Sequence, residues 1–406
     1  MTETPEVYFG SAIPGVPYHF ANMSEKLDKI LEQLDLSTIN KRDKVAVKMH
    51  LGFHDGYQTV PVFFIRRIVE AIKKQGAFPF VTDNPTAVYQ AVNRGYTQET
   101  CGCPIIPVAG VHDGYVSKKK VDIKGIKSLN AAGVLLDADV LINLVHSKGH
   151  GACGYGGAFK NIALGGFSGP TRWRTIHGIV QRDKYFDEEK MTKEHLEKLR
   201  DACPRNAPAW SDNAGKASLV FYECDQCHGG KQLCVEADGG VTGWSINPEN
   251  FNSFQELMAA NAKIILDSFD DSKVFHLNFL LNITPFCDCM GMAMPSVIDD
   301  IGIVASRDIV AVDTASLDLI AKQGLNESMI KKIPKRYMRV NPNLKAKLHP
   351  FQLIHGPLKD PYQVARYGEA RGMGSSKYKL VEILSAKETA VMDPPKHQYE
   401  SGPTFY

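Results

Sequence analysis

The sequence predicts an α/β fold: a mostly parallel sheet with flanking helices, interrupted by a small cysteine-rich segment. Two observations lead to this prediction. Short apolar runs alternate with helical patterns over the first two hundred residues, and the alternation resumes after residue 250. Between these parts, residues 201–250 are rich in Cys, Gly, Asn, Pro and Asp and contain a single strand-like piece, ASLVFYE. Such a break in one repeating pattern is typical of an insertion.

The first half of the pattern contains one well-marked helix between predicted strands. Residues 61–75 place apolar side chains at helical spacing, with Pro61 at the start and Gly76 just past the end. Pro79 suits a strand start or a sheet edge, because proline donates no backbone hydrogen bond. The strands are predicted at residues 45–49, 78–82 and 140–145.

The second half continues the same alternation. It predicts a helix at 253–268, a strand at 274–283 and a helix at about 310–322. We therefore expect residues 1–200 and 251–400 to form one α/β domain, with residues 201–250 projecting from it as an insert. Residues 401–406 are expected to be a tail.

Two segments outside this pattern are expected to be arms. Residues 326–350 are basic and contain proline, as expected of a solvated surface arm. The chain after residue 392 has no core-forming pattern and is expected to extend, lying on another subunit of a homo-oligomer.

Composition excludes several classes of function. The chain has 406 residues, with 47 Lys and Arg against 45 Asp and Glu, and a formal net charge of +2. This balance argues against a protein that binds nucleic acid or a membrane surface, which would present a basic face. The N-terminus has no charged region followed by an apolar run, and no stretch reaches the ~18 apolar residues of a spanning helix. We therefore expect a cytoplasmic protein, whose nine cysteines serve as metal ligands or redox groups.

Four cysteines of the insert match half of a ferredoxin pattern. A two-cluster bacterial ferredoxin repeats C-x2-C-x2-C-x3-C-P, and the fourth Cys of each repeat binds the other repeat's cluster. Cys203, followed by Pro204, matches the fourth Cys of a first repeat, and Cys224 and Cys227 begin a second. Cys234 matches its third Cys, displaced by a four-residue insertion. Together these cysteines form the ligand set of one 4Fe–4S cluster.

The positions that the pattern has lost belong to the other cluster. They are occupied by Lys193, Leu196, Leu199 and Asp238. Random loss would not usually leave one complete set, which favours a degenerate ferredoxin-like insert with one retained cluster. Two alternatives stay open: a structural zinc site, in which His228 replaces one thiolate, and cysteines that bind no metal.

A second group of reactive residues follows the predicted strands. In open α/β sheets, ligands bind beyond the carboxyl ends of the strands. The loop after residue 145 carries two histidines, a thiol, two lysines and several glycines, which suits the binding of an anion. Cys101 and Cys103 have no histidine nearby and are expected to be structural. The predicted pocket residues are His50, Asp83, His146, His150, Lys160, Cys287 and Cys289.

These pocket residues suggest distinct roles. His146 and His150 would supply nitrogen ligands or transfer protons near neutral pH. Lys160 would offset charge on an anionic substrate or on a thiolate-rich centre, and Cys287 and Cys289 would bind a second metal. The alternative is that the histidines only fix a glycine-rich loop and that the two cysteines fill buried space.

Five stretches carry a family resemblance. They are KMHLGFHDGY near residue 48, FPFVTDNPTAVY near 78, HSKGHGACGYGGAFKNIALG at 146, NFLLNITPFCDCMGMAMPSVIDDIGIVASRDIVAVDTASLDLI from 278 and ARYGEARGMGSSKYKLVEI near the end. With them the chain resembles the domain of unknown function 362 family of iron–sulfur-associated proteins. Members commonly carry a two-cluster ferredoxin insert between the glycine-rich loop and the NITP segment, which is where the cysteine-rich insert lies here. The resemblance implies a redox context without a settled reaction.

Three functions are compatible with these observations. The first is an oxidoreductase or electron-transfer protein, in which a cluster passes single electrons to chemistry at the pocket, with a small-molecule substrate or a redox partner protein. The second is a non-redox enzyme or binding module that holds a metal and an anion, with zinc in the insert. The third is an accessory protein that docks a partner through its arms. The sequence has no G-x-G-x-x-G at a strand-to-helix turn, so no nicotinamide or flavin site is predicted.

Overall fold

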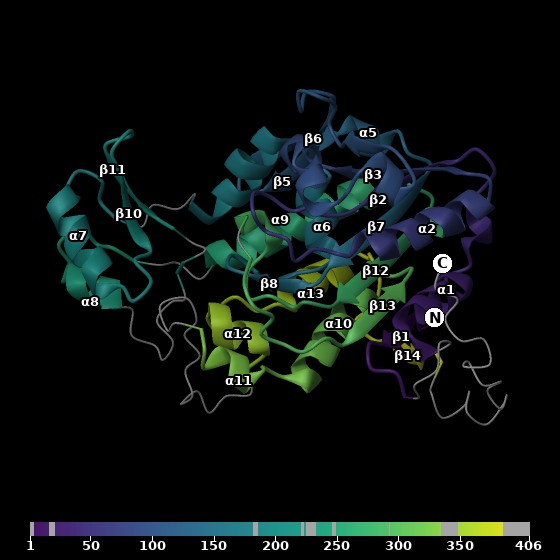
Figure 1. Cartoon of the computed structure of the whole chain (residues 1–406). Coiled ribbons are helices and arrows are strands. Elements are labelled where there is room, and N and C mark those ends of the chain that lie inside the picture. The colour runs from purple at the N-terminus through teal and green to yellow at the C-terminus, as the bar shows by residue number, and fades with distance from the viewer. Residues whose placement is uncertain are drawn as a thin grey trace.

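An eight-stranded sheet forms the centre of the protein (Figure 1). The computed structural model describes residues 4–15, 21–181, 186–220, 223–224, 233–245, 249–291, 293–333 and 348–384. The strand order is β14-β1-β13-β12-β7-β2-β3-β4. The strands are β1 (Glu6–Ser11), β2 (Lys44–Lys48), β3 (Phe78–Asp83), β4 (Ile105–Pro107), β7 (Val140–His146), β12 (Val274–Leu280), β13 (Gly302–Ser306) and β14 (Lys379–Glu382).

Seven strands of this sheet run in one direction. β12, β7, β2, β3 and β4 are parallel neighbours, and β14 is parallel to β1. Only β13 is reversed within the described sheet, since it pairs antiparallel with both β12 and β1. The prediction of a mostly parallel sheet with flanking helices is confirmed, and strands from before residue 200 and after residue 250 share it.

Both faces of the sheet are covered by helices. In β7, Val140, Ile142 and Leu144 join the core that contains α1 and α2, whereas Leu141 and Val145 join the core with α6, α9 and α10. Because both faces are buried, the central strands read as nearly continuous apolar runs. The covering helices are α1 (Met23–Gln33), α2 (Val62–Lys74), α6 (Ala158–Gly165), α9 (Glu249–Leu266), α10 (Ile309–Gln323) and α13 (Gln363–Ala370).

Most predicted element boundaries lie close to the observed ones. α2 begins directly after Pro61 and ends before Gly76, which has φ +78°. The strand predicted at 274–283 ends earlier, at Leu280, because Asn282 adopts a left-handed backbone conformation with φ 49° that a strand cannot continue through. Pro79 lies inside β3, but β4 pairs only with residues 81–83 and so does not reach it.

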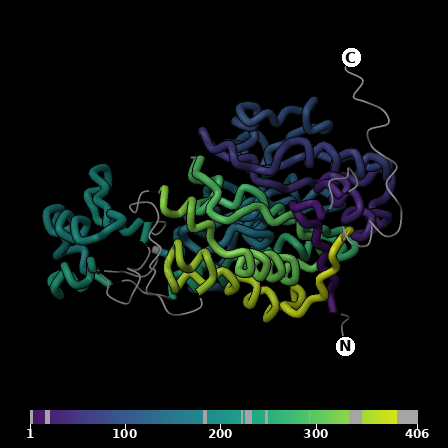
Figure 2. Tube along the Cα trace, turned by 60° about the horizontal axis from the view of Figure 1, so that its bottom comes forward, coloured from purple at the N-terminus to yellow at the C-terminus, as the bar shows by residue number. Residues whose placement is uncertain are grey.

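A lobe that stands apart from the sheet in Figures 1 and 2 contains elements of the cysteine-rich segment 201–250 and the helix before it. It consists of α7 (Lys193–Ala202), β10 (Pro208–Ser211), β11 (Lys216–Leu219) and α8 (Leu233–Asp238). The expectation of one strand-like piece in 201–250 was incomplete, because β10 and β11 form an antiparallel hairpin. Lys359 donates to the carbonyl oxygen of Cys224, which lies between β11 and α8 in the sequence.

Smaller elements complete the fold. No helix among the described residues is both long enough and apolar enough to cross a membrane. Most of the predicted arm at 326–350, and the whole chain after residue 392, lie outside the described residues. The short elements are α3 (Pro85–Tyr89), α4 (Gln98–Cys101), α5 (Gly133–Leu136), α11 (Glu327–Ile330), α12 (Pro350–His355), the hairpin β5 (Val116–Ile123) and β6 (Ile126–Ala132), and the hairpin β8 (Lys148–His150) and β9 (Gly154–Gly156).

Candidate functional site

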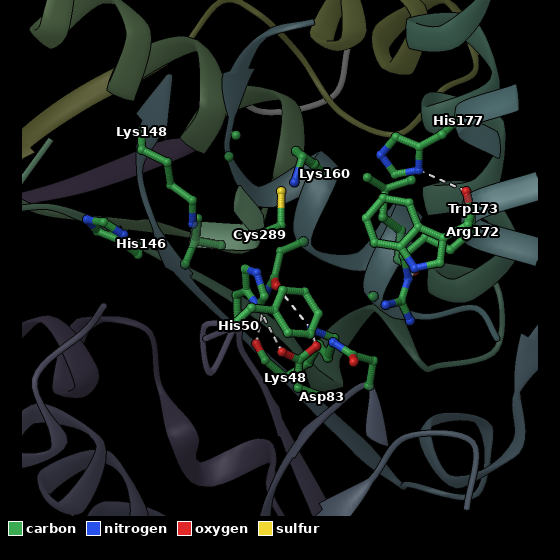
Figure 3. Close-up of a pocket in the computed structure, with 18 residues that line it drawn as sticks. Lys48, His50, Asp83, His146, Lys148, Lys160, Arg172, Trp173, His177 and Cys289 are labelled. Atoms are coloured by element: carbon green, nitrogen blue, oxygen red, sulfur yellow. Dashed lines mark hydrogen bonds and ion pairs between the residues drawn. The ribbon is translucent and has the colours of Figure 1, made fainter. Parts of the chain in front are cut away.

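The carboxyl ends of β3, β2, β7 and β12 lie next to one another at one edge of the sheet. Side chains from these ends and from the following loops line an inner cavity of about 50 Å³ (Figure 3). Five of the predicted pocket residues line it: His50, Asp83, His146, Lys160 and Cys289. The other two, His150 and Cys287, join Cys289 in a group whose ligand atoms all lie within 4.8 Å of one another. The structure thus brings together all seven predicted residues.

Asp83, the last residue of β3, pairs with two cations. Its Oδ1 accepts a hydrogen bond from Lys48 Nζ at 3.1 Å, and its Oδ2 accepts one from His50 Nδ1 at 2.8 Å. Burial acts to raise the pKa of Asp83, but Lys48 and His50 hold that pKa well below its ordinary value. Burial likewise acts to lower the pKa of His50, yet Asp83 and the Cys287 sulfur raise it above the ordinary value. Asp83 is therefore ionised, and His50 favours its charged form.

Lys48 also ties the strand ends to helix α6. It donates to the carbonyl of Met49 at 2.7 Å and to Asn161 Oδ1 at 3.1 Å. The Asn161 amide in turn donates to the Lys48 carbonyl at 2.9 Å and to Asn143 Oδ1 at 2.7 Å. Lys48 was not among the pocket residues predicted from the sequence. The available signal was a charged side chain at the end of an apolar parallel strand, which needs a buried partner.

Asp288 anchors the loop that follows β12. It accepts from His146 Nδ1 at 3.0 Å and from Lys148 Nζ at 2.8 Å. Burial acts to raise the pKa of Asp288, but His146 and Lys148 lower it to about 2. His146 Nε2 lies 2.9 Å from the carbonyl oxygen of Leu281. Both nitrogens of this ring lie beside oxygen atoms of the protein, so neither is left open toward a metal.

Cys287 and Cys289 form an asymmetric thiol pair. The Cys287 sulfur accepts from Lys160 Nζ at 3.3 Å and from the Cys289 backbone N–H at 3.3 Å. Burial acts to raise the pKa of Cys287, but the Cys289 thiol, Lys160 and His50 bring it well below the ordinary value. Hydrogen bonding to Cys287, with burial, raises the pKa of Cys289 well above its ordinary value. The pair therefore holds one thiolate, on Cys287, and one thiol.

His150 completes the group of metal-ligating side chains. Its Nδ1 accepts from the backbone N–H of Ala152 at 3.2 Å and lies 3.2 Å from the Cys153 sulfur. Burial, with a smaller effect of Lys160, lowers the pKa of His150 well below its ordinary value, so the ring is neutral at pH 7. A neutral imidazole beside a thiolate and a thiol is a ligand set able to hold a transition metal ion.

A glycine allows this group to assemble. Any Cβ at Gly149, between Lys148 and His150, would overlap the carbonyl oxygen of Pro285. A hydrogen bond also joins the two segments at this point, since the Gly149 N–H donates to the Thr284 carbonyl at 2.9 Å. The β8–β9 hairpin can therefore lie directly on the loop that carries the two cysteines.

Three residues at the pocket come from a segment that the sequence analysis did not single out. Arg172 and Trp173 lie in a π-helix at Thr171–Ile176, and His177 follows it. Figure 3 shows these three side chains on the opposite side of Cys289 and Lys160 from His146 and Lys148. The Trp173 and His177 rings stack with their centroids 4.8 Å apart, and burial lowers the pKa of His177 to about 4. Nothing in the sequence pattern marks this segment, because it follows α6 rather than a strand.

The remaining cysteines lie elsewhere. Cys203, Cys224 and Cys234 are buried in or beside the lobe, where Cys203 ends α7 and Cys234 lies in α8. Their roles as cluster ligands stay a prediction, since the predicted ligand Cys227 and the alternative ligand His228 lie outside the described residues. Cys101 and Cys103 are buried in the core on the α2 face. Burial raises the pKa of Cys103 to about 12.

Fold and site together define an α/β protein with a His/Cys group able to hold a metal. Residues 45–318 match the model of a family described as "Domain of unknown function (DUF362)". This match covers more than half of the chain, and the protein belongs to that family.

Comparisons with individual proteins add little. A comparison with curated protein sequences finds no significant match. Among solved structures, the lactate racemase apoprotein from Thermoanaerobacterium thermosaccharolyticum matches with a TM-score of 0.37 and 9% sequence identity. The match covers 80% of this chain and 58% of the racemase chain. A likeness at this level assigns no activity.

Proposed function

We propose that this protein is a metal-dependent oxidoreductase that acts on a small molecule at the sheet-edge pocket and carries one 4Fe–4S cluster in its lobe. The observation that carries the proposal is the convergence of His150, Cys287 and Cys289, with Cys287 held as a thiolate beside Lys160. Thiolate and imidazole ligands favour iron, copper or zinc over magnesium or calcium. The small volume of the inner cavity favours a small substrate.

The lobe cysteines are compatible with a cluster. Cys203, Cys224 and Cys234 are all buried, and α7, which ends just before Cys203, contacts α8, which contains Cys234. Among the described residues their three sulfurs do not all lie within 4.8 Å of one another. A 4Fe–4S cluster held by these cysteines would supply single electrons when bound.

The chain's own side chains would position a substrate and a proton. Lys160 keeps the Cys287 sulfur anionic and faces the cavity. His50 donates through Nδ1 to Asp83, which fixes the ring, and its buried Nε2 has no hydrogen-bond partner of good geometry among the described residues. A charged His50 would therefore hold a transferable proton at Nε2, toward the cavity that it lines.

The proposal is tested by anaerobic purification followed by metal analysis, acid-labile sulfide analysis and electron paramagnetic resonance. The double variant Cys287→Ser/Cys289→Ser should lose the pocket metal and keep the sulfide and the visible absorbance of the cluster. Cys224→Ser should lose the sulfide and the visible absorbance of the cluster and keep the pocket metal. Cys101→Ser/Cys103→Ser is the matched control, with the same C-x-C spacing at two residues that do not line the pocket, and should change neither. Unchanged metal content in the first double variant would refute the pocket site, and wild-type protein without sulfide would refute the cluster.

A second candidate function is a non-redox metal- and anion-binding enzyme. The observation that favours it is the number of cations at the pocket, where Lys148, Lys160 and Arg172 all line the cavity. Colourless protein with stoichiometric zinc and no sulfide would select this function over the first.

A further inference from the structure

We infer that the pocket binds a small oxyanion, a carboxylate or phosphate, attached to a planar apolar body, with Arg172 holding the oxyanion and Trp173 packing on the body. This inference rests on the proposed function, because it names the substrate class of the same site. It starts from two observations that the proposed metal chemistry does not use: a buried guanidinium with no ion pair among the described residues, and a second cavity that adjoins the first.

The positive charge at the inner cavity is only partly neutralised. Three lysines and one arginine line it: Lys48, Lys148, Lys160 and Arg172. Lys48 Nζ lies 3.1 Å from Asp83, Lys148 Nζ 2.8 Å from Asp288 and Lys160 Nζ 3.3 Å from the Cys287 sulfur. Arg172 has no such partner among the described residues. Buried charge without a counter-charge is costly, so an anionic ligand would stabilise the site.

Arg172 is the cation that makes no ion pair with a described residue, although the Asp83 and Asp113 carboxylates act on it from beyond ion-pair distance. Lys48 and His50 share Asp83, whereas the Arg172 Nε donates to the Leu164 carbonyl and its Nη2 to the Phe167 carbonyl, each at 3.0 Å. Both acceptors are neutral, and Arg172 forms no ion pair with any described residue even though it is only 6% exposed. A guanidinium that has donors left over presents the fork geometry that binds carboxylate or phosphate.

The second cavity places a larger group beside this guanidinium. An outer cavity of about 400 Å³ adjoins the inner one. The two share Phe53, Asn84, Arg172, Trp173 and Cys289, so Arg172 and Trp173 stand at their junction. A ligand with its oxyanion at Arg172 would extend either toward Cys289 or out into this space.

The walls of the outer cavity favour a planar body with a polar substituent. Trp173 stacks on His177, yet 48% of its surface stays exposed, and Phe53 lines the same cavity. An aromatic side chain so exposed at a cavity offers a stacking surface. Asp113 also lines the cavity, and its buried Oδ1 has no hydrogen-bond partner among the described residues. A hydroxyl or amino group on the ligand would satisfy that oxygen.

Three probes test the inference on the as-purified protein: benzoate, phenyl phosphate and benzyl alcohol, which share a ring and differ in charge. Calorimetry should show binding of at least one oxyanion probe, with benzyl alcohol at least about tenfold weaker, because the charged hydrogen bonds to Arg172 are lost. Arg172→Lys should weaken the better probe by roughly tenfold, since lysine cannot form the bidentate fork. Trp173→Leu should also weaken it, by several-fold, through loss of stacking.

Tryptophan fluorescence locates the bound ring. Trp173→Phe should remove quenching by the oxyanion probe while keeping the heat of binding, because phenylalanine still stacks. Trp210→Phe is the matched control, since Trp210 lies in β10 of the lobe, and should keep both signals. If Arg172→Lys unfolds, Trp173→Leu still tests the site, because its side chain is half exposed.

Three results would overturn the inference: equal affinity for benzyl alcohol and the oxyanions, wild-type affinity in both Arg172→Lys and Trp173→Leu, or no binding of either oxyanion up to roughly 10 mM. Metal content measured on the same samples keeps the two proposals distinct. Oxyanion binding by protein that holds no pocket metal would leave the inference standing and refute the proposed metal chemistry. Pocket metal without oxyanion binding would overturn the inference and leave the proposed metal chemistry standing.

Discussion

At the scale of single residues, the pocket consists of buried charges that keep one another ionised. Asp83 shows this most clearly, because it is buried and holds Lys48 and His50. Removing one partner of such a group is costly, since the others remain charged in a buried site. Replacing the whole group by apolar side chains would cost much less, so these charges are better explained by function than by stability.

We expect Asp83→Asn to lower the free energy of unfolding by about 3–5 kcal/mol at pH 7, because it leaves two buried cations without their anion. The pKa of Asp83 is depressed in the folded state, so its contribution is present above the unfolded pKa of about 3.9 and is lost as pH falls through the folded value. His50 has a raised pKa, so its contribution is present below about 6.5 and is lost as pH rises through the folded value.

Urea unfolding of the single and double variants measures this coupling. Asp83→Asn/Lys48→Met should lose less stability than the two single variants added together, because the second change removes one of the stranded cations. Strict additivity would mean that the ion pair contributes nothing.

The Cys287 thiolate gives a second prediction at this scale. The ultraviolet absorbance of thiolate, taken as the difference between metal-free wild type and Cys287→Ser, should persist well below the ordinary thiol pKa of about 8.5. Lys160→Met should shift this transition to higher pH, since it removes the cation that favours the thiolate. A transition at the same pH in both proteins would show that Lys160 does not set the charge of this sulfur.

At the scale of elements, helix α6 positions the pocket lysine through its first turn. Asp313 of α10 accepts from the backbone N–H of Ala158 at 2.7 Å and of Phe159 at 3.0 Å. Gly157 precedes the helix, and a Cβ there would overlap both the Tyr155 ring and the Asp313 carboxylate. The start of α6 is thus fixed by a buried carboxylate that leaves no room for a side chain.

We therefore expect Gly157→Ala to lower stability by about 1–3 kcal/mol and to reduce metal or probe binding at the pocket, because α6 must shift. Gly178→Ala is the matched control, since the nearest atom to a Cβ there, the Trp173 carbonyl oxygen, is 4.0 Å away. Thermal unfolding and binding of both variants check this. Equal behaviour of the two alanine variants would refute the role assigned to Gly157.

Element prediction from sequence was good where one periodicity dominates. Residues 61–75 and 140–145 follow helical or buried-strand patterns, and the observed α2 and β7 lie at those positions. The end of β12 was missed because it depends on the backbone conformation of one residue, Asn282, rather than on a pattern. The π-helix at Thr171–Ile176 was missed for a similar reason, since its place beside the pocket depends on packing against α6 and α9.

At the scale of the whole molecule, sequence predicted which residues meet but not what they bind to. The seven pocket residues could be placed together because parallel strands bring their carboxyl ends to one sheet edge. The pairing of His146 with Asp288 could not, because it joins residues 142 positions apart through a loop of irregular shape. That pairing gives His146 an anchoring contact instead of the open nitrogen that its position in the sequence suggested.

The contact between the lobe and the main unit gives a prediction at this scale. Lys359 is fully buried, donates to the Cys224 carbonyl and lies 5.2 Å from the centroid of the Phe251 ring. Lys359→Met should speed the loss of the lobe's metal centre to a chelator several-fold without removing a ligand, because the backbone beside Cys224 loses a charged hydrogen bond. Lys127→Met, at an exposed ion pair with Asp122, should leave the rate unchanged. Equal chelation rates in the two variants would show that this contact does not support the centre.

The position of β1 in the sheet has a consequence for synthesis of the chain. β1 pairs with β13, some three hundred residues later, and with β14, where Glu6 is opposite Lys379. At a translation rate of about 5–20 residues per second, the first strand waits roughly 15–60 s for its first partner. Its pairing edges stay open for that time, so the nascent chain should be sensitive to protease within β1 until β13 has left the ribosome. We therefore expect the sheet to be completed only when its carboxyl-terminal strands are made, so that β1, the first strand made, is among the last to pair.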